Sequence, residues 1–386
     1  MKSFDFYNPT RILFGLGKIG ALPQYLPEQA RILFCFDEDA VMGNHVYEAT
    51  RAALKAFPLT EFGGIKPNPD YDYLMKALPL IKKHSINWIV SAGGGSVLDG
   101  GKFIAAAAAY KSDPWTLTEK PFLVKQALPH ACILTLSASG TEMNQWGVVS
   151  RRSLKLKRDF SGEALFPKLS ILDPSALLTL PNHQVSNGII DAFSHVLEQY
   201  LTLPADTQLQ DRQAEALLLT LMENGRTILK NPLDLSARSQ FMWAATLALN
   251  DHLQTGVPSD FSSHRLSHAM TALYGLEHAE TLALIFPATL FALKDMKRSK
   301  LLRYAKMFWQ LTDSDENRLI DVAIQKTRNF FAEVGGVVDP RVHGLTPAII
   351  PEILAYIESE YGYPLGECHP IYEKEARVIL EVMFQE

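Results

Sequence analysis

Two pairs of polar residues in the C-terminal half of the chain have a spacing that places each pair on one face of a helix. Asp191 and His195 stand four residues apart, His264 and His268 repeat this spacing, and His278 follows ten residues later. Side chains at positions i and i+4 share a helix face. A carboxylate and several imidazoles are the ligands that hold a divalent cation such as Zn²⁺ or Fe²⁺. We therefore predict a metal centre, and the alternative is a set of hydrogen-bonded histidines without a metal.

A glycine-rich loop carries the second chemical signal. Gly93, Gly94 and Gly95 separate an apolar run from an alanine-rich stretch that begins with Ser96. Glycines allow a sharp turn and a close approach to a ligand, and the free N–H groups at a helix start bind phosphate. The spacing is neither GxGxxG nor the Walker motif, which argues against nucleotide hydrolysis. The loop predicts a cradle for the pyrophosphate of a dinucleotide, unless it is only a tight turn capped by Ser96.

Two further loops follow apolar runs in the same half of the chain. Thr135 and Ser139 belong to a hydroxyl-rich loop. Loops at the carboxyl ends of parallel strands line one crevice, so this loop and the glycine loop are predicted to bind one ligand, unless the hydroxyls are only turn caps. Asp37 comes directly after an earlier apolar run, where an acid commonly binds the ribose hydroxyls of adenosine. Glu38 and Asp39 follow it, so a 2′-phosphate would meet negative charge. These acids favour NAD over NADP, unless they only form an acidic loop cap.

The pattern of apolar residues indicates which elements position these groups. Continuous apolar runs at residues 31–36, 88–92 and 131–135 are typical of strands buried on both faces. Helical patterns lie between them, at 46–57, 71–84 and 96–110, which implies a mostly parallel, doubly wound sheet. Beyond residue 180 only helical patterns follow, at 208–230, 236–254, 279–293, 317–334 and 347–360. We predict an α/β domain over residues 1–180 and an all-helical domain over residues 181–386, with a cleft between them as the site.

Composition narrows the class of protein. The 386 residues are 47% hydrophobic and 20% charged, which is typical of a folded globular protein of two domains. The net charge of −5 and the scattered basic residues argue against a nucleic-acid partner. Cys35, Cys132 and Cys368 are far apart and indicate a reducing compartment. The sequence shows neither a signal peptide nor a long apolar segment, so we expect a cytoplasmic protein with no membrane partner.

The ordered motifs resemble those of the iron-containing (group III) alcohol dehydrogenases, in particular the butanol dehydrogenase and aldehyde reductase branch. The resemblance covers nearly the whole chain and rests on these segments: Phe14-Gly-x-Gly17, Gly64 to Pro69, Gly93 to Asp99, Asp173-Pro174, Leu180-Pro181, Gly188-x-x-Asp191-Ala-Phe-x-His195 and Ser263 to Ala279. It implies a Rossmann-like dinucleotide-binding domain and a helical metal-binding domain, the architecture of dehydroquinate synthase. It also implies a homodimer.

The resemblance assigns roles residue by residue. It implies that the metal ligands are Asp191, His195, His264 and His278, and that His268 is an active-site histidine that binds no metal. His268 is then a candidate for relaying a proton to solvent. Together with the loops described above, it predicts these cofactor-binding residues: Asp37, Asn68, Gly94, Gly95, Ser96, Asp99, Thr135, Ser139, Lys157 and Leu180.

The implied activity is reversible hydride transfer between a nicotinamide cofactor and a primary alcohol or aldehyde, with one divalent metal, iron or zinc, as Lewis acid. The chain departs from the family pattern in three places. It has Ser137-Ala-Ser-Gly-Thr-Glu142 where relatives have Pro-x-Thr-Gly-Ser-Glu, Tyr274 where many have histidine, and Asp37 where NADPH-preferring relatives have glycine. Two other functions stay open at this stage, a phosphate-eliminating cyclase of the dehydroquinate synthase type and a non-catalytic nucleotide sensor. The cyclase needs a dense basic pocket, whereas the basic cluster at 151–158 is more typical of an exposed hairpin or loop.

Overall fold

The computed structural model describes residues 1–386 except 38–40, 42, 205, 367–368 and 386. Its contacts divide the chain into two compact units. The strand-bearing unit contains Tyr7–Gln184 and Lys230–Asn250, and the helical unit contains Met1–Phe6, Val185–Leu229 and Asp251–Glu386. Both units are therefore discontinuous in sequence, unlike the predicted division at residue 180.

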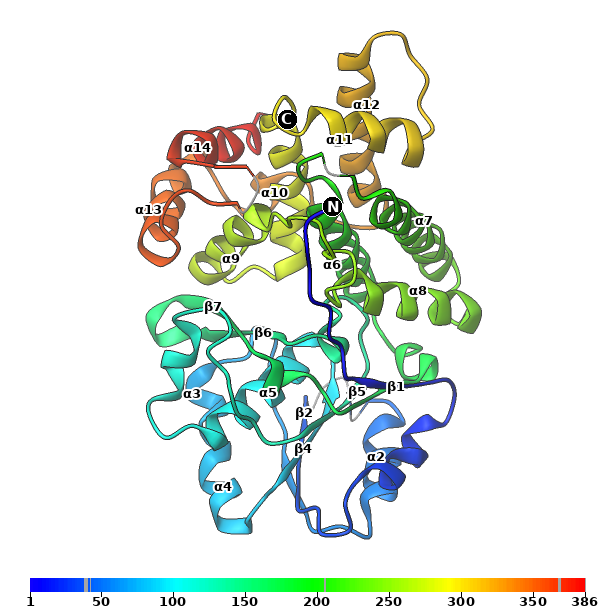
Figure 1. Ribbon diagram of the computed structural model, residues 1–386, viewed down its shortest axis with the longest axis vertical. Coiled ribbons are helices and arrows are strands. Elements are labelled where there is room, and N and C mark those ends of the chain that lie inside the picture. The colour runs from blue at the N-terminus through cyan, green and yellow to red at the C-terminus, as the bar shows by residue number, and fades with distance from the viewer. Residues whose placement is uncertain (38–40, 42, 205, 367–368, 386) are drawn as a thin grey trace. The chain divides into compact units, whose positions relative to one another are not determined.

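The strand-bearing unit is built on a parallel sheet of six strands in the order β1-β8-β5-β4-β2-β3 (Figure 1). Its strands are β1 Arg11–Phe14, β2 Ile32–Phe36, β3 Leu59–Phe62, β4 Trp88–Gly93, β5 His130–Leu134 and β8 Leu169–Leu172. An antiparallel hairpin, β6 Trp146–Arg151 and β7 Leu156–Ser161, carries the basic cluster, in which Arg152 and Lys155 are exposed as predicted but Lys157 is buried. Its helices are α2 Val46–Leu54, α3 Tyr71–Leu74, α4 Ala77–His84, α5 Gly95–Ala109 and α8 Leu235–Ala248.

Alternating side chains of the buried strands form the two cores of this unit. Ile32, Phe34 and Phe36 of β2 pack with α2, whereas Leu33 and Cys35 pack on the face that holds α5. Successive residues of a strand point to opposite faces, so a continuous apolar run is what a two-sided burial requires. The predicted fold class, a mostly parallel sheet flanked by helices, is confirmed.

The helix α8 joins this unit although it follows the first helices of the C-terminal half. Asp234 caps its N-terminus by accepting a hydrogen bond from the N–H of Ala237, at 2.9 Å. Met242 packs with Leu134 of β5 in a small buried cluster, and Thr246 donates to the buried carboxylate of Glu142. A helix that supplies core contacts and a buried hydrogen bond belongs to the unit it completes.

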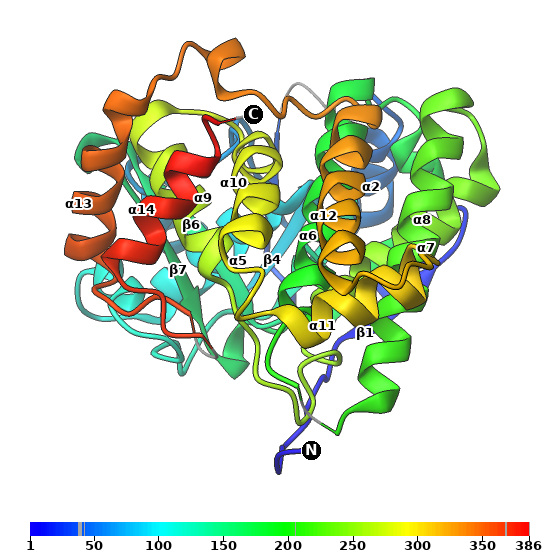
Figure 2. The same cartoon turned by 90° about the horizontal axis from the view of Figure 1, so that it is seen from above.

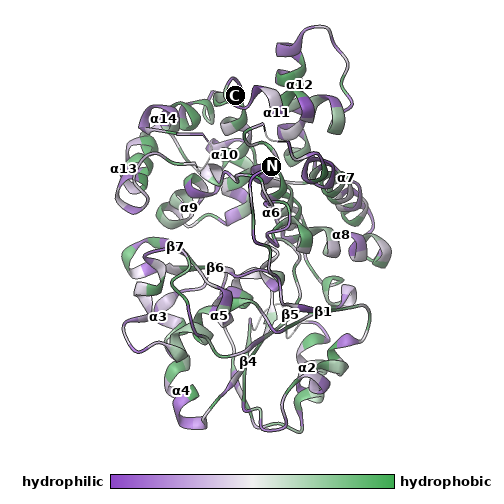
Figure 3. Ribbon diagram, in the orientation of Figure 1, coloured by the Kyte–Doolittle hydropathy of each residue, from purple (hydrophilic) through white to green (hydrophobic). Residues whose placement is uncertain are grey.

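The helical unit contains α6 Asn182–Tyr200, α7 Gln208–Lys230, α9 Ser262–Tyr274, α10 His278–Ala292, α11 Arg298–Arg303, α12 Glu316–Glu333, α13 Ile350–Glu360 and α14 Glu373–Val382. Within this unit α10 packs against α9, α12 and α14, and α13 packs against α9 (Figures 1 and 2). The buried residues of α12 recur with the helical period from Leu319 to Phe331, and Figure 3 shows both purple and green along this helix. No helix among the described residues is long and apolar enough to cross a membrane.

Candidate metal centre

The helix α6 supplies the first two of the predicted ligands. Asp191 and His195 are 6% and 4% exposed, and Ile190 and Phe193 beside them are fully buried. The apolar neighbours fix the rotation of α6, so that its polar pair faces the interior of the helical unit. The Oδ1 atom of Asp191 lies 3.7 Å from Nδ1 of His195.

The turn between α9 and α10 brings two more histidines to this pair. Gly275 ends α9 with a φ of 73°, a left-handed conformation that favours glycine. Glu277 and Glu280 then form a capping box, which begins α10 at His278. His264 lies in the first turn of α9, and the two imidazoles come within 5.2 Å of each other between ring centres.

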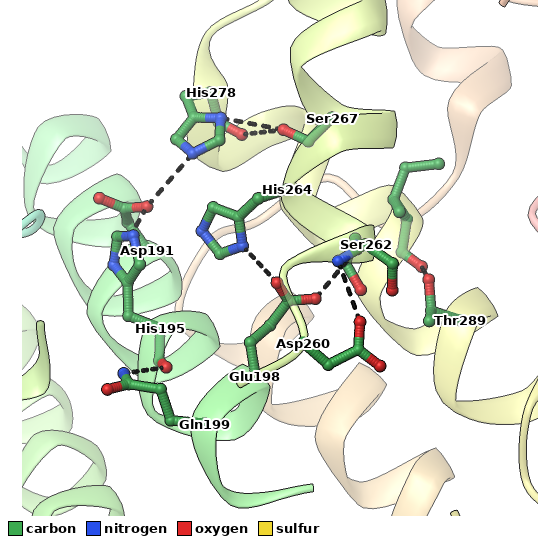
Figure 4. Close-up of polar contacts among 12 residues, drawn as sticks. Asp191, His195, Glu198, Gln199, Asp260, Ser262, His264, Ser267, His278 and Thr289 are labelled. Carbon is green, nitrogen blue, oxygen red and sulfur yellow. Dashed lines mark hydrogen bonds and ion pairs between the residues drawn. The ribbon is translucent and has the colours of Figure 1, made fainter. Parts of the chain in front are cut away.

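The structure gathers the four predicted ligands around one point (Figure 4). Ligand atoms of Asp191, His195 and His264 all lie within 4.8 Å of one another. The rings of His195 and His264 are stacked with centres 4.6 Å apart. His278 is less buried than the other three, and its Nε2 atom approaches the same Oδ1 atom of Asp191, at 3.7 Å.

The donor set fits a divalent cation better than it fits a hydrogen-bonded cluster. Asp191 Oδ1 and His195 Nδ1 are buried atoms without a hydrogen-bond partner among the described residues, and their separation of 3.7 Å is too long for a hydrogen bond. Two ligand atoms bound at about 2.1 Å to one tetrahedral ion stand roughly 3.4 Å apart. The observed separation therefore matches two ligands of a shared ion, which would also satisfy both buried atoms.

The electrostatics of the cluster keep His195 in the neutral form that binds metals. Burial lowers the pKa of His195 to about 4, although the charge of Asp191 acts in the opposite direction. A histidine must lose its second proton before it can bind a metal. At neutral pH, His195 is therefore ready to act as a ligand.

Two side chains that we did not predict contact the predicted ligand histidines. Glu198 Oε2 lies 2.9 Å from Nδ1 of His264, and the hydroxyl of Ser267 lies 2.9 Å from Nδ1 of His278. Burial, followed by the charge of Asp260, raises the pKa of Glu198 to about 8. Glu198 stands three residues after His195, a spacing that places it on the same helix face and is the sequence signal that was available.

His268 lies next to the four predicted ligands. It is one helical turn after His264, is 9% exposed, and its ring centre is 5.1 Å from that of His278. The Nδ1 atom of His268 lies 3.5 Å from the hydroxyl of Tyr361. Tyr274, which stands in place of a histidine of many relatives, donates its hydroxyl to Glu352 at 2.7 Å.

In the strand-bearing unit the structure joins several of the predicted cofactor residues. The hydroxyl of Ser96 accepts a hydrogen bond from the N–H of Asn68, at 3.2 Å. Lys157 donates to the amide oxygen of Asn68, at 3.1 Å. A Cβ atom on Gly95 would lie 2.5 Å from the hydroxyl of Ser139, so the glycine loop and the hydroxyl loop are in direct contact. Both loops follow the carboxyl ends of neighbouring strands, β4 and β5, as expected.

The remaining predicted cofactor residues lie at separate positions of the strand-bearing unit. Both carboxylate oxygens of Asp99 bond within the unit, to the hydroxyl of Thr141 at 2.6 Å and to the N–H of Val148 at 3.0 Å, and its pKa is raised by burial. The N–H of the buried Thr135 bonds the carbonyl of Gly93, and Leu180 packs at the edge of the cluster that contains Met242. Gly94 precedes the first residue of α5, and Asp37 is half-buried directly after β2. Glu38, Asp39 and Cys368 lie outside the described residues.

Comparison with known proteins places these features in a family context. Residues 9–174 match the family model of iron-containing alcohol dehydrogenase, and residues 185–339 match that of the C-terminal part of Fe-containing alcohol dehydrogenases. The chain is 43% identical to the NADPH-dependent aldehyde reductase YqhD of Escherichia coli over 384 residues, which is 99% of each chain. It is 33% identical to the NADH-dependent butanol dehydrogenase B of Clostridium acetobutylicum over 343 residues, 87% of this chain and 88% of the relative.

Comparison with solved structures identifies relatives of the same two kinds, an aldehyde reductase and a butanol dehydrogenase. A crystal structure of Escherichia coli YqhD superposes with a TM-score of 0.97 at 42% identity, covering 99% of each chain. The NADH-dependent butanol dehydrogenase A of Thermotoga maritima superposes with a TM-score of 0.95 at 31% identity, covering 100% of this chain and 99% of the other.

Proposed function

Because this chain belongs to the iron-containing alcohol dehydrogenase family, as its motifs predicted, it is an oxidoreductase of the alcohol dehydrogenase and aldehyde reductase type, and we propose that its metal ligands are Asp191, His195, His264 and His278. The observation that carries the assignment is the pair of buried, unsatisfied atoms, Asp191 Oδ1 and His195 Nδ1, at a ligand-to-ligand separation. The proposed reaction is reversible hydride transfer between a nicotinamide cofactor and a primary alcohol or aldehyde.

Residues of the helical unit have two roles in the proposed reaction, metal binding and proton transfer. Asp191 contributes the one negative charge of the ligand set, and the three histidines bind through neutral imidazole nitrogens. A divalent iron or zinc ion bound there supplies a Lewis acid that polarises the substrate oxygen. His268, which lies outside the ligand set, holds the proton that the substrate oxygen gains or loses, and Tyr361 orients its ring.

In the strand-bearing unit the proposed cofactor contacts fall into two groups. The N–H groups that follow Gly94 and Gly95 at the start of α5 bind the pyrophosphate, because a helix start attracts anions. Asn68 already contacts both Ser96 and Lys157, and these three residues bind the ribose near the nicotinamide. Asp99 supports these contacts by tying α5 to the hairpin β6–β7.

We propose that the chain prefers NAD to NADP, because Asp37 stands at the carboxyl end of β2. A carboxylate about 4 Å from a 2′-phosphate disfavours it by roughly 1 kcal/mol in water and ~4 kcal/mol at an intermediate dielectric. The names of the relatives include both an NADPH-dependent and an NADH-dependent enzyme, so the preference follows from this charge and not from kinship.

The assembly and location of the protein are also proposals. The first strand, β1, is at an edge of the sheet, and Phe14 of β1 and Leu16 after it are 39% and 60% exposed. An exposed edge strand with apolar neighbours is a surface that a second copy can cover, which supports a homodimer. Cys35 and Cys132 are buried free thiols, which fits the proposed cytoplasmic location.

The test is an assay of the purified chain loaded with Fe²⁺ or Zn²⁺. We expect oxidation of NADH with short and medium straight-chain aldehydes, loss of the rate after chelation, and recovery when the metal is restored. If no alcohol or aldehyde changes the rate of NADH oxidation or NAD reduction in the presence of metal, the dehydrogenase assignment is wrong. Release of inorganic phosphate from a phosphorylated substrate would instead favour the cyclase, and a metal-free protein that binds the dinucleotide without turnover would favour the sensor.

A further inference from the structure

Glu198 holds one of the proposed ligands in place. Its carboxylate is 4% exposed and lies at the C-terminal end of α6, seven residues after Asp191. One oxygen, Oε2, is 2.9 Å from Nδ1 of His264, and the other, Oε1, accepts a hydrogen bond from the N–H of Ser263 at 3.0 Å. Both carboxylate oxygens therefore face the first turn of α9, where His264 begins its approach to the site.

A second ion pair fixes the segment against which Glu198 packs. The N–H of Asp260 bonds the carbonyl of Glu198, at 3.3 Å. The buried carboxylate of Asp260 in turn pairs with Lys297 at 3.1 Å, and Lys297 also donates to the carbonyl of Leu201, at 2.8 Å. The end of α6, the start of α9 and the residue before α11 are thus tied together by buried polar contacts that surround Glu198.

This contact determines which nitrogen of His264 faces the ligand set. Because Nδ1 of His264 faces Glu198, Nε2 is the nitrogen left to bind a metal, and a neutral histidine that binds through Nε2 keeps its proton on Nδ1 and donates it to Oε2 of Glu198. A carboxylate that holds a ligand histidine in this way fixes its ring orientation and increases its basicity, and loss of such a partner typically weakens metal binding about 10- to 100-fold.

We propose that Glu198 is a positioning residue of the metal centre, which fixes the tautomer and orientation of His264 through the Oε2 to Nδ1 hydrogen bond. The inference rests on the proposed ligand set and adds a residue that this set does not contain. His278 has a different support, because its Nδ1 atom contacts the neutral hydroxyl of Ser267, which also contacts Thr281 at 2.6 Å. The two histidines that come from α9 and α10 are thus oriented by different groups, a carboxyl group and a hydroxyl.

The experiment measures metal affinity rather than turnover. Full-length wild type, Glu198→Gln and Glu198→Asp are stripped of metal and titrated with Co²⁺ against a chromophoric chelator, and the visible spectrum of the bound ion is recorded. Glu215→Gln is the matched control, because Glu215 is also a buried glutamate of the helical unit but pairs with Arg303 at 2.6 Å. Urea unfolding of the four metal-free proteins measures the purely structural contribution.

We expect the Kd for Co²⁺ to rise about 10- to 100-fold in Glu198→Gln, with an altered spectrum, and to stay within about threefold of wild type in Glu215→Gln even where that variant unfolds more easily. Glu198→Asp keeps the charge but shortens the side chain, so it serves as the readout if the glutamine variant does not fold, and we expect weaker binding there too. A wild-type Kd and spectrum in a folded Glu198 variant, or equal weakening in the control, overturns the inference. Absence of Co²⁺ binding by the wild type would instead overturn the proposed metal centre.

Discussion

A substitution of the buried Lys102 of α5 should change the stability and cofactor binding of the strand-bearing unit without changing metal binding by the helical unit. Lys102 is fully buried, and its ammonium group donates to the carbonyl of Asn144 at 2.9 Å, to the side-chain oxygen of Asn144 at 3.1 Å and to the carbonyl of Trp146 at 2.7 Å. Its charge also lowers the pKa of Asp99 against the larger, opposite effect of burial. Lys102 thus ties the segment that precedes β6 to α5, the helix of the proposed phosphate site.

Replacement of Lys102 by methionine keeps an unbranched side chain, one atom shorter, and removes the charge and three hydrogen bonds. Leaving buried oxygens without a donor costs about 1–3 kcal/mol each, and the relief from burying an ammonium group offsets part of this cost. We therefore expect the strand-bearing unit to lose ~3 kcal/mol in its free energy of unfolding, a fall in Tm of about 6–12 °C. Because the 144–146 segment loosens, the KM for the nicotinamide cofactor should rise.

The metal content supplies the discriminating measurement, because all four proposed ligands belong to the helical unit. Lys102→Met should bind the same amount of metal as wild type while its cofactor KM rises. Lys300→Met is the control, since Lys300 is a buried lysine of the helical unit that pairs with Asp211 at 2.5 Å; it should lower stability without changing the cofactor KM. An unfolding free energy of Lys102→Met within about 1 kcal/mol of wild type, with an unchanged KM, would refute the reasoning.

Three more measurements test other parts of the structure. Asp37→Gly should shift the NAD to NADP ratio of kcat/KM toward NADP by between about 5-fold and about 10³-fold, and an unmoved ratio would remove Asp37 from cofactor selection. Asp191→Asn should lose bound metal and turnover together, while the exposed Asp206→Asn keeps both; retained metal in the first variant contradicts the ligand assignment. Burial and the charge of Lys102 lower the pKa of His130 to about 3, so the unfolded chain takes up a proton below pH ~6.5 while the native state does not. His130 therefore contributes roughly 3 kcal/mol to the loss of stability between pH 7 and pH 4.5. Urea unfolding at the two pH values should show this contribution to be absent in His130→Gln and present in the exposed His183→Gln.

The elements that could be predicted from the sequence are those set by local patterns, a continuous apolar run for a buried strand and the i to i+4 spacing for one face of a helix. The predicted strand at residues 88–92 is β4, with an end shifted by one residue, because a strand buried on both faces needs a continuous apolar run. The i to i+4 pair of Asp191 and His195 lies on a single helix, α6, so its geometry is local and predictable. The predicted helix over 71–84 is instead two helices, α3 and α4, since the ring of Pro79 is incompatible with a helical carbonyl four residues earlier.

The end of α8 and the partner of Glu198 depend on tertiary contacts, which the pattern of residues in each segment does not predict. The helix predicted over 236–254 ends at Ala248, where Leu249 leaves the helical conformation and its free carbonyl accepts a hydrogen bond from the side chain of Asn144. The role of Glu198 depends on α9 approaching α6, and the helical period of α6 alone does not predict which of its polar residues meets a partner. Periodicity reports the face of a helix, whereas the partner of that face is set by the rest of the chain.

The return of α8 to the strand-bearing unit determines the order in which the polypeptide can finish folding during translation. Residues 7–184 leave the ribosome with β5 and Glu142 already made, but their contacts with Met242 and Thr246 do not yet exist. The nascent strand-bearing unit stays incomplete until residue 250 has emerged, by which time α6 and α7 of the other unit have been synthesised as well. A gene fragment cut at residue 184 would therefore encode an open sheet with an uncovered core rather than an independent dinucleotide-binding module.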